Sequence, residues 1–182
     1  MFLSDKDIRK EVKEGAITIN DFDEERLQPA SYDILLGNKF IITDLHSTES
    51  IDPERGVLPE TYEMTIKDGD PFVLHPGVSV VGFSKDYFGS DKYLVEVNGK
   101  SSLARIGLLV HNSASLINPG HYLNLALELC NLNNVPLILR PGMRIAQLTF
   151  SELSDKPEAD YKATGRYHDK EDQMNGFVLP KK

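Results

Sequence analysis

The sequence predicts a single, mostly β domain, either a sandwich or a barrel, with one short helix at its N-terminus. Short apolar or alternating runs recur along the 182 residues, and proline and glycine separate them at regular intervals. This pattern is typical of antiparallel all-β folds rather than of a parallel α/β sheet. A chain of this length fits one domain and can bury a substantial core.

The predicted helix begins after Ser4, which is a good N-cap residue. Asp7, three positions later, completes a variant of the capping box. Leu3 and Ile8 occupy the two positions of a hydrophobic staple, and Gly15 ends the run. We therefore expect a short amphipathic helix that packs on the remainder of the domain.

The strands are expected in the apolar runs that follow. The polar segment 44–70 has weak periodicity and is expected to be a long excursion between strands. The tail 154–182 is rich in charge and glycine, which is typical of a mobile C-terminal arm. The predicted strands are 39–43, 71–77, 78–83, 93–97, 123–131, 135–142 and 144–150.

The composition excludes several classes of protein. A net charge of −8 argues against a protein that holds nucleic acid, but a few cations and backbone N–H groups are enough for a small phosphorylated ligand. Cys130 is the single cysteine, so neither an intrachain disulfide nor a cysteine-rich zinc site is expected. No apolar run approaches the roughly 20 residues that span a bilayer, and the N-terminus is charged. We expect a cytoplasmic protein without membrane contacts.

The segment NGKSSLARIGL (98–108) is the first candidate site. Lys100, Ser101 and Ser102 follow Gly99 and offer a cation, two hydroxyls and backbone N–H groups. If a helical turn begins at Ser101, Arg105 lies on the same face. These residues form either an anion-binding cradle at a helix N-terminus or a capped surface helix with solvated cations.

The second candidate is LNLALELCN (123–131), in which leucine occupies every other position. In a strand these leucines form one apolar face, and Glu128 points to the other face together with Ala126 and Cys130. Glu128 is then either exposed on an edge strand or lines a cavity, where it can transfer protons. The segment 140–150, by itself, indicates only a hairpin.

Several signatures of catalytic chemistry are absent. The five histidines are scattered, and the zinc deaminase motif is missing. There is no P-loop, no GxGxxG and no GxSxG. Any hydrolysis is therefore expected to depend on a carboxylate that activates water, without zinc.

Taken together, these pieces resemble the dCTP deaminase branch of the trimeric dUTPase superfamily. The resemblance spans most of the chain, and the order and spacing of its motifs make it specific. The motifs are LSDKDI (3–8), QPASYDILLGNKF (28–40), LHPG (74–77), GKSSLARIGLLVH (99–111), INPG (117–120), ALEL (126–129) and RPGMRIAQLTF (140–150).

The resemblance implies a distorted β-barrel of the jelly-roll, dUTPase-like type that assembles as a homotrimer with active sites between subunits. It also implies that residues 1–182 form one domain whose arm, 154–182, closes over the active site. In this family the catalytic roles fall on Glu128, Ser101 and Arg105. The implied substrate-binding residues are Lys100, Ser102, Ala114, Asn118, Ala126, Leu127, Tyr161, Arg166 and Gln173, with Lys170 as an alternative to Gln173.

The implied function is hydrolysis of dCTP to dUTP and ammonia. Glu128 takes a proton from water, hydroxide adds at C4 of cytosine, and the proton passes on as ammonia leaves, while Ser101 and Arg105 orient the water. Mg²⁺ is expected to be bound through the triphosphate, with no metal site of the protein's own. dTTP, which inhibits some relatives, is a further candidate ligand.

Three positions depart from the family's pattern. Lys100 stands where arginine is common, and Leu123 replaces the glycine of an aromatic-x-Gly pattern. Asn118 stands where the family has an aspartate that activates the water attacking the α-phosphate, and an amide cannot act as a base. The main prediction is therefore a deaminase that releases dUTP. The alternatives are a dUTP diphosphatase or bifunctional enzyme that forms dUMP and pyrophosphate, and a non-catalytic nucleotide-binding relative.

Overall fold

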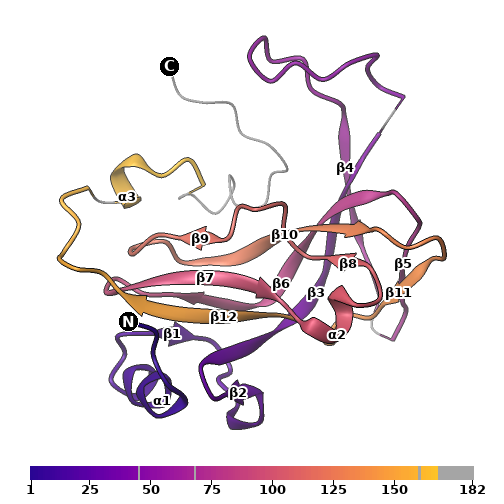
Figure 1. The fold of residues 1–182 in the computed structure, drawn as a ribbon. Coiled ribbons are helices and arrows are strands. Elements are labelled where there is room, and N and C mark those ends of the chain that lie inside the picture. The colour runs from indigo at the N-terminus through magenta and orange to yellow at the C-terminus, as the bar shows by residue number, and fades with distance from the viewer. Residues whose placement is uncertain (45, 68, 160, 168–182) are drawn as a thin grey trace.

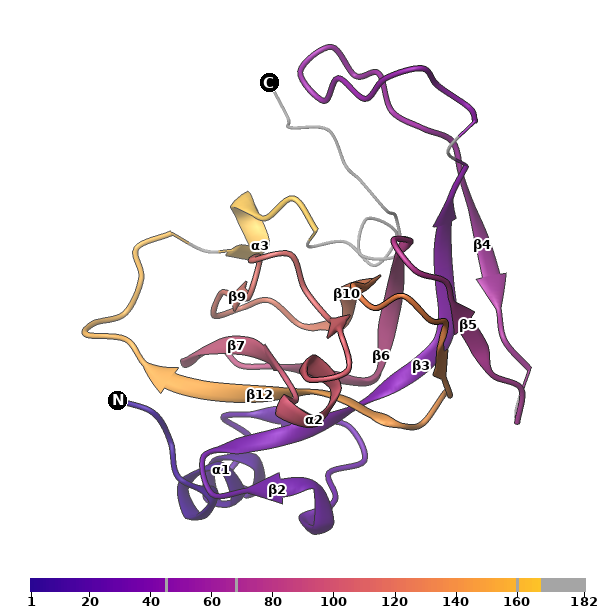
Figure 2. The same cartoon turned by 45° about the vertical axis from the view of Figure 1, so that its right-hand side comes forward.

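The computed structural model describes residues 1–44, 46–67, 69–159 and 161–167, and its fold is mostly β (Figure 1). Within that part of the chain, ten strands form one antiparallel sheet whose main path is β8-β10-β6-β3-β12-β7-β9. β1, β2 and β4 pair with strands of this path, and β5 and β11 form a separate two-stranded sheet. The large sheet curls into a half-barrel (Figure 2), which confirms the predicted fold class at that level.

The helices and strands have the following bounds in chain order. They are α1 (Asp5–Lys13), β1 (Thr18–Ile19), the 3-10 turn η1 (Glu24–Arg26), β2 (Leu27–Gln28), β3 (Ser31–Thr43), β4 (Thr61–Thr65), β5 (Phe72–Leu74), β6 (Ser79–Gly89), β7 (Tyr93–Gly99), α2 (Ser101–Ala104), β8 (Leu108–Leu109), β9 (Leu116–Ile117), β10 (Leu123–Asn131), β11 (Leu137–Leu139), β12 (Arg144–Glu152) and α3 (Tyr161–Thr164).

The predicted N-terminal helix is confirmed as α1. Ser4 Oγ accepts a hydrogen bond from the Asp7 backbone, and the Asp7 carboxylate accepts one from the Ser4 backbone, so the capping box is complete. Ser4 Oγ also donates to Asp7 Oδ2 over 2.7 Å, and this hydrogen bond, followed by the one from the Ser4 backbone, lowers the pKa of Asp7. Leu3 and Ile8 are both buried and fasten the helix to the core.

The structure shortens the predicted strands 71–77 and 135–142 to Phe72–Leu74 and Leu137–Leu139, and it lengthens two others. β3 begins at Ser31 rather than residue 39, and β6 continues to Gly89 rather than ending at residue 83. The start of β3 was not predicted as a strand because its residues are polar. These polar residues point into a buried network that is described below. The excursion 44–70 contains β4, whose five residues are all exposed and therefore show no alternation.

β3 changes partner along its length. Its first half pairs with β12 and its second half with β6, and the register with β6 shifts between Leu36 and Phe40. Gly37 lies in this shift, where a Cβ atom would stand 2.8 Å from the Phe83 carbonyl oxygen. Only glycine fits this close approach of two backbones without displacing one of them.

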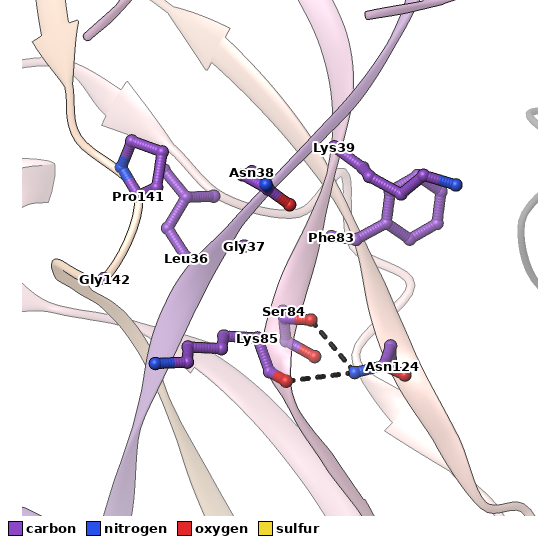
Figure 3. A pocket seen from close by; sticks show the side chains of 10 residues that line it. All are labelled: Leu36, Gly37, Asn38, Lys39, Phe83, Ser84, Lys85, Asn124, Pro141 and Gly142. Atoms are coloured by element: carbon purple, nitrogen blue, oxygen red, sulfur yellow. Dashed lines mark hydrogen bonds between the residues drawn. The ribbon is translucent and has the colours of Figure 1, made fainter. Parts of the chain in front are cut away.

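A cavity of about 440 Å³ lies beside this register shift (Figure 3). Gly37 and Lys85 line it, and the Asn124 amide donates to the backbone carbonyls of Ser84 and Lys85 at its wall. None of the predicted site residues lines this cavity. No helix of the described part of the chain is both long and apolar enough to cross a membrane.

A buried ion pair fixes the N-terminal segment to the sheet. Arg26 and Asp86 are 4% and 4% exposed, and Arg26 Nη1 donates to Asp86 Oδ1 over 2.7 Å. The second oxygen of Asp86 accepts a hydrogen bond from the Leu35 backbone, and Arg26 Nη2 donates to the Asp21 carbonyl. Each charge is therefore both paired and hydrogen-bonded, which is the condition for burying it.

We expect Arg26→Ala to lower the free energy of unfolding by about 3–5 kcal/mol, because it leaves Asp86 buried without a counter-charge. Urea unfolding followed by circular dichroism at one protein concentration measures this. Arg9→Ala removes the exposed pair of Arg9 with Glu24 and should leave the transition almost unchanged. Equal effects of the two substitutions would contradict the assignment.

Candidate active site

A second cavity, of about 320 Å³, opens between β10, the turn that follows β9, and the described part of the arm. Five of the predicted site residues line it, namely Ala114, Asn118, Ala126, Glu128 and Tyr161. They come from three segments of the chain: Ala114 and Asn118 flank β9, Ala126 and Glu128 belong to β10, and Tyr161 begins α3. The fold therefore gathers the predicted catalytic carboxylate and most of the predicted base and sugar contacts in one place.

β10 positions Glu128. The leucines of this strand are buried and the residues between them are half-buried, as the alternation predicts. β10 pairs along its length with β6, where Glu128 stands opposite Val81, and β8 pairs only with Cys130 and Asn131. It lines the cavity, and its Oε2 accepts a hydrogen bond of 3.3 Å from the backbone of Asn112. Of the two alternatives for Glu128, the structure favours the cavity.

A tight turn places Asn118 in the same cavity. The His121 N–H donates to the Asn118 carbonyl over 3.1 Å, and Gly120 adopts a φ of 86°, which favours glycine. The Gly120 N–H also donates to the Ser90 carbonyl, so the turn is tied to the end of β6. The turn presents the Asn118 amide and the His121 ring to the cavity.

The described part of the arm passes beside β9, where α3 lies in Figures 1 and 2, and its Tyr161 and Tyr167 line the cavity. The Tyr161 ring stacks on His121 with 4.3 Å between ring centroids and 24° between planes. His121 Nε2 lies 3.0 Å from the Tyr167 carbonyl oxygen, to which it donates. Burial raises the pKa of the Tyr161 hydroxyl. Lys162 Nζ lies 3.4 Å from Asp91 Oδ1 and joins the same segment to the body of the domain.

His121 and Tyr167 are cavity residues that sequence reasoning missed. His121 occupies the first position of the expected aromatic-x-Gly pattern, and that mismatch was the available signal. Tyr167 had no local signal, since it reaches the cavity only through the path of the arm. Arg166 is exposed and does not line the cavity, and Gln173 and Lys170 lie outside the described residues.

The predicted phosphate cradle lies elsewhere on the chain. A helical turn, α2, begins at Ser101 as expected, and the side chains of Ser101, Ser102 and Arg105 are exposed. The cavity that contains Glu128 is lined neither by these three residues nor by Lys100. Lys100 pairs with the buried Asp33. Within one chain, the cradle and the cavity are therefore two separate places.

Leu127 is the one residue of Ala126–Glu128 that faces away from the cavity. Its side chain is fully buried in the core and does not line the cavity. The period of the strand requires this, because a residue between Ala126 and Glu128 points to the opposite face. A contact of Leu127 with a nucleotide is thus limited to its backbone.

The described residues contain no group of three or more histidine, cysteine, aspartate or glutamate side chains that could hold a metal ion.

The fold and the site define a class of protein, a mostly β protein with a carboxylate in a cavity and a separate turn of cations and hydroxyls. A family model described as dCTP deaminase-like matches residues 2–153. The "dCTP deaminase, dUMP-forming" of Dictyoglomus thermophilum is 40% identical over 174 residues, which cover 92% of this chain and 90% of that protein. The "dCTP deaminase" of Natronomonas pharaonis is 42% identical over 168 residues, which cover 90% and 86%.

This chain belongs to the dCTP deaminase-like family. The names of the relatives agree with the predicted class of enzyme, a deaminating hydrolase. The crystal structure of a 2′-deoxycytidine 5′-triphosphate deaminase from Agrobacterium tumefaciens superimposes with a TM-score of 0.64 at 23% identity. The match covers 84% of this chain and 48% of that one, so the chain spans about half the length of that protein, and the likeness supports the fold.

We expect His121→Ala to expose the arm to protease. It removes the ring stack with Tyr161 and the hydrogen bond to Tyr167, which together are worth about 1–3 kcal/mol. Tryptic cleavage after Lys162 should then accelerate by roughly tenfold, measured by mass spectrometry of timed digests. His75→Ala, at an exposed histidine outside the cavity, is the matched control. Cleavage at the wild-type rate in His121→Ala would show that His121 does not hold the arm.

Proposed function

We propose that this protein is a bifunctional dCTP deaminase that hydrolyses dCTP to dUTP and ammonia and then dUTP to dUMP and pyrophosphate. The sequence analysis favoured a single reaction that ends at dUTP. A relative that is named dUMP-forming and aligns with nearly the whole chain supports the combined reaction instead. The observation that carries the proposal is that Glu128 and Asn118, the residues predicted for the two steps, line one cavity.

Glu128 is the proposed acid and base of the deamination. It removes a proton from a water molecule, the resulting hydroxide adds to C4 of the cytosine ring, and the carboxylic acid returns the proton to the departing amino group. The position of Glu128 on the half-buried face of β10 supports this role, because a ring in the cavity would lie against Ala126 and Glu128. Positioned proton transfer of this kind contributes about 10²–10⁴ in rate.

The proposed active site needs a second subunit. Ser101 and Arg105 are expected to orient the attacking water, yet they do not line the cavity of their own chain. In the proposed homotrimer the cradle of one subunit faces the cavity of the next, so that Ser101, Ser102, Arg105 and Lys100 hold the triphosphate of a base bound by the neighbour. The exposure of Ser101, Ser102 and Arg105 supports this arrangement, since all three are accessible to a partner.

We propose that Mg²⁺ reaches the site bound to the substrate. Bound to the triphosphate, it would neutralise phosphate charge, and no step is assigned to it. Arg166 and Gln173 remain proposed contacts of the closing arm, and dTTP remains a proposed inhibitor.

Asn118 makes the second step the slower one in this proposal. Phosphate hydrolysis depends mainly on positioning and charge stabilisation, which an amide beside the sugar can support. An asparagine cannot take the proton of the attacking water, so the contribution of a general base is missing. dUTP is therefore expected to accumulate before dUMP appears.

The direct test is a time course of purified protein with dCTP and Mg²⁺, with nucleotides resolved by chromatography and ammonia measured in parallel. We expect ammonia and dUTP first and dUMP later, and dUMP also from added dUTP. Glu128→Gln should abolish ammonia release while nucleotide binding, measured by calorimetry, is largely kept. Ammonia release without any dUMP would return the function to the single deamination. Near-normal turnover by Glu128→Gln would refute the mechanism.

Asn118→Asp tests the assignment of the slow step. The new carboxylate can accept the proton of the attacking water, so the conversion of dUTP to dUMP should accelerate by at least about tenfold, while ammonia release from dCTP changes little. The matched control is Asn134→Asp, which places a carboxylate on an exposed residue that neither lines the cavity nor contacts Glu128. Unchanged dUMP formation in Asn118→Asp would show that this position does not limit the phosphate step.

A further inference from the structure

A transverse row of polar side chains lies beneath the cradle, across three neighbouring strands. In the register of the sheet, Asp33 of β3 stands opposite Gln147 of β12, and Gln147 stands opposite Asn98 of β7. Residues directly opposite one another project from the same face of a sheet. Lys100, two positions after Asn98, extends back over this face to Asp33.

Asp33 is the charged centre of this row. Its side chain is 2% exposed, and its two oxygens face two different cations. Oδ1 accepts a hydrogen bond of 2.5 Å from Lys100 Nζ, and Oδ2 lies 3.6 Å from Arg144 Nη1. The cations are more accessible than the carboxylate, with side chains 23% and 41% exposed. The group therefore presents positive charge outward over a buried negative one.

Gln147 ties the backbone of the cradle to the same row. Its Nε2 donates to the Gly99 carbonyl over 3.1 Å, and its Oε1 accepts from Ser31 Oγ over 2.9 Å. Gly99 and Lys100 immediately precede α2. The position of the Ser101 turn on the sheet is thus set from both sides, by a backbone hydrogen bond and by the anchored side chain of Lys100.

We infer that Asp33 is a positioning residue that holds Lys100 and Arg144 side by side as one anion-binding unit at the start of the cradle. Arg144 is then a phosphate contact in addition to those predicted. This inference rests on the proposed triphosphate substrate and names a part of its binding site. A lysine is a point charge on a flexible chain, so it gains directional precision only when a fixed acceptor restrains it.

The direction in which Asp33→Asn changes the affinity for an anion distinguishes positioning of the two cations from a simple charge effect. Asp33→Asn removes a negative charge from the neighbourhood of a triphosphate, and charge alone would then tighten anion binding several-fold. If Asp33 acts by holding the two cations, the same substitution frees them and binding weakens instead. The two accounts predict opposite directions.

The test uses inorganic triphosphate as the probe, with its affinity for the full-length protein measured by calorimetry. We expect Asp33→Asn to weaken binding by about tenfold or more, as for loss of a charged hydrogen bond, and to raise KM for dCTP with kcat changed by less than about threefold. Tighter or unchanged binding in Asp33→Asn would overturn the inference. Because this probe is not a nucleotide, the result stands even if no deamination is found.

A double-mutant cycle excludes a merely structural effect. In a Lys100→Met background, Asp33→Asn should cost much less affinity than in the wild type, because the cation that it positions is already absent. A structural disturbance would cost the same in both backgrounds and would refute positioning. Asp86→Asn is the matched control, since it also breaks a buried ion pair, on the other side of β3. It should lower stability and leave triphosphate affinity unchanged.

Arg144→Gln is a second variant for this test, and it does not disturb the interior because Arg144 is a partly exposed residue at the start of β12. We expect this variant to fold normally and to bind inorganic triphosphate several-fold more weakly, with a shallower dependence on salt. Wild-type affinity in Arg144→Gln would remove Arg144 from the proposed unit.

Discussion

The backbone pairing of β3 is the constraint on which the remainder of the structure depends. This 13-residue strand pairs first with β12 and then with β6, and it ends beside β4. The register with β6 shifts between Leu36 and Phe40, and Gly37 permits the two backbones to approach each other there. The sheet curls at this point into two parts that share one strand.

The separation of the cradle from the cavity follows from this division. β12 and β7 extend one part of the sheet and carry Asp33's partners and the Ser101 turn, whereas β6 and β10 extend the other part and carry Glu128. The Glu128 carboxylate would repel a phosphate chain, whereas the cations of the cradle would attract it. Because the two groups lie on different strands, the cations do not neutralise the carboxylate. In the proposed trimer, association brings the two kinds of surface together.

How far the sequence predicts the structure depends on whether a feature is local. The capping box of α1 and the alternation of β10 were predictable, because they depend on residues a few positions apart. The start of β3 was not, because Ser31 and Asp33 are polar yet buried by partners from other strands. Within the candidate site, Glu128 and Asn118 were predicted from motifs, while His121 was overlooked because its partners come from the arm.

By itself, the sequence determined the fold class, the N-terminal helix, the face of β10 that carries Glu128 and the resemblance to one family. These depend on short-range periodicity and on the order of motifs, both of which a single chain displays without folding. Only the tertiary structure decided which distant residues meet. Lys100 and Asp33 are 67 positions apart, and His121 and Tyr167 are 46 apart. Such contacts arise from strand pairing and from the path of the arm, which no local pattern specifies.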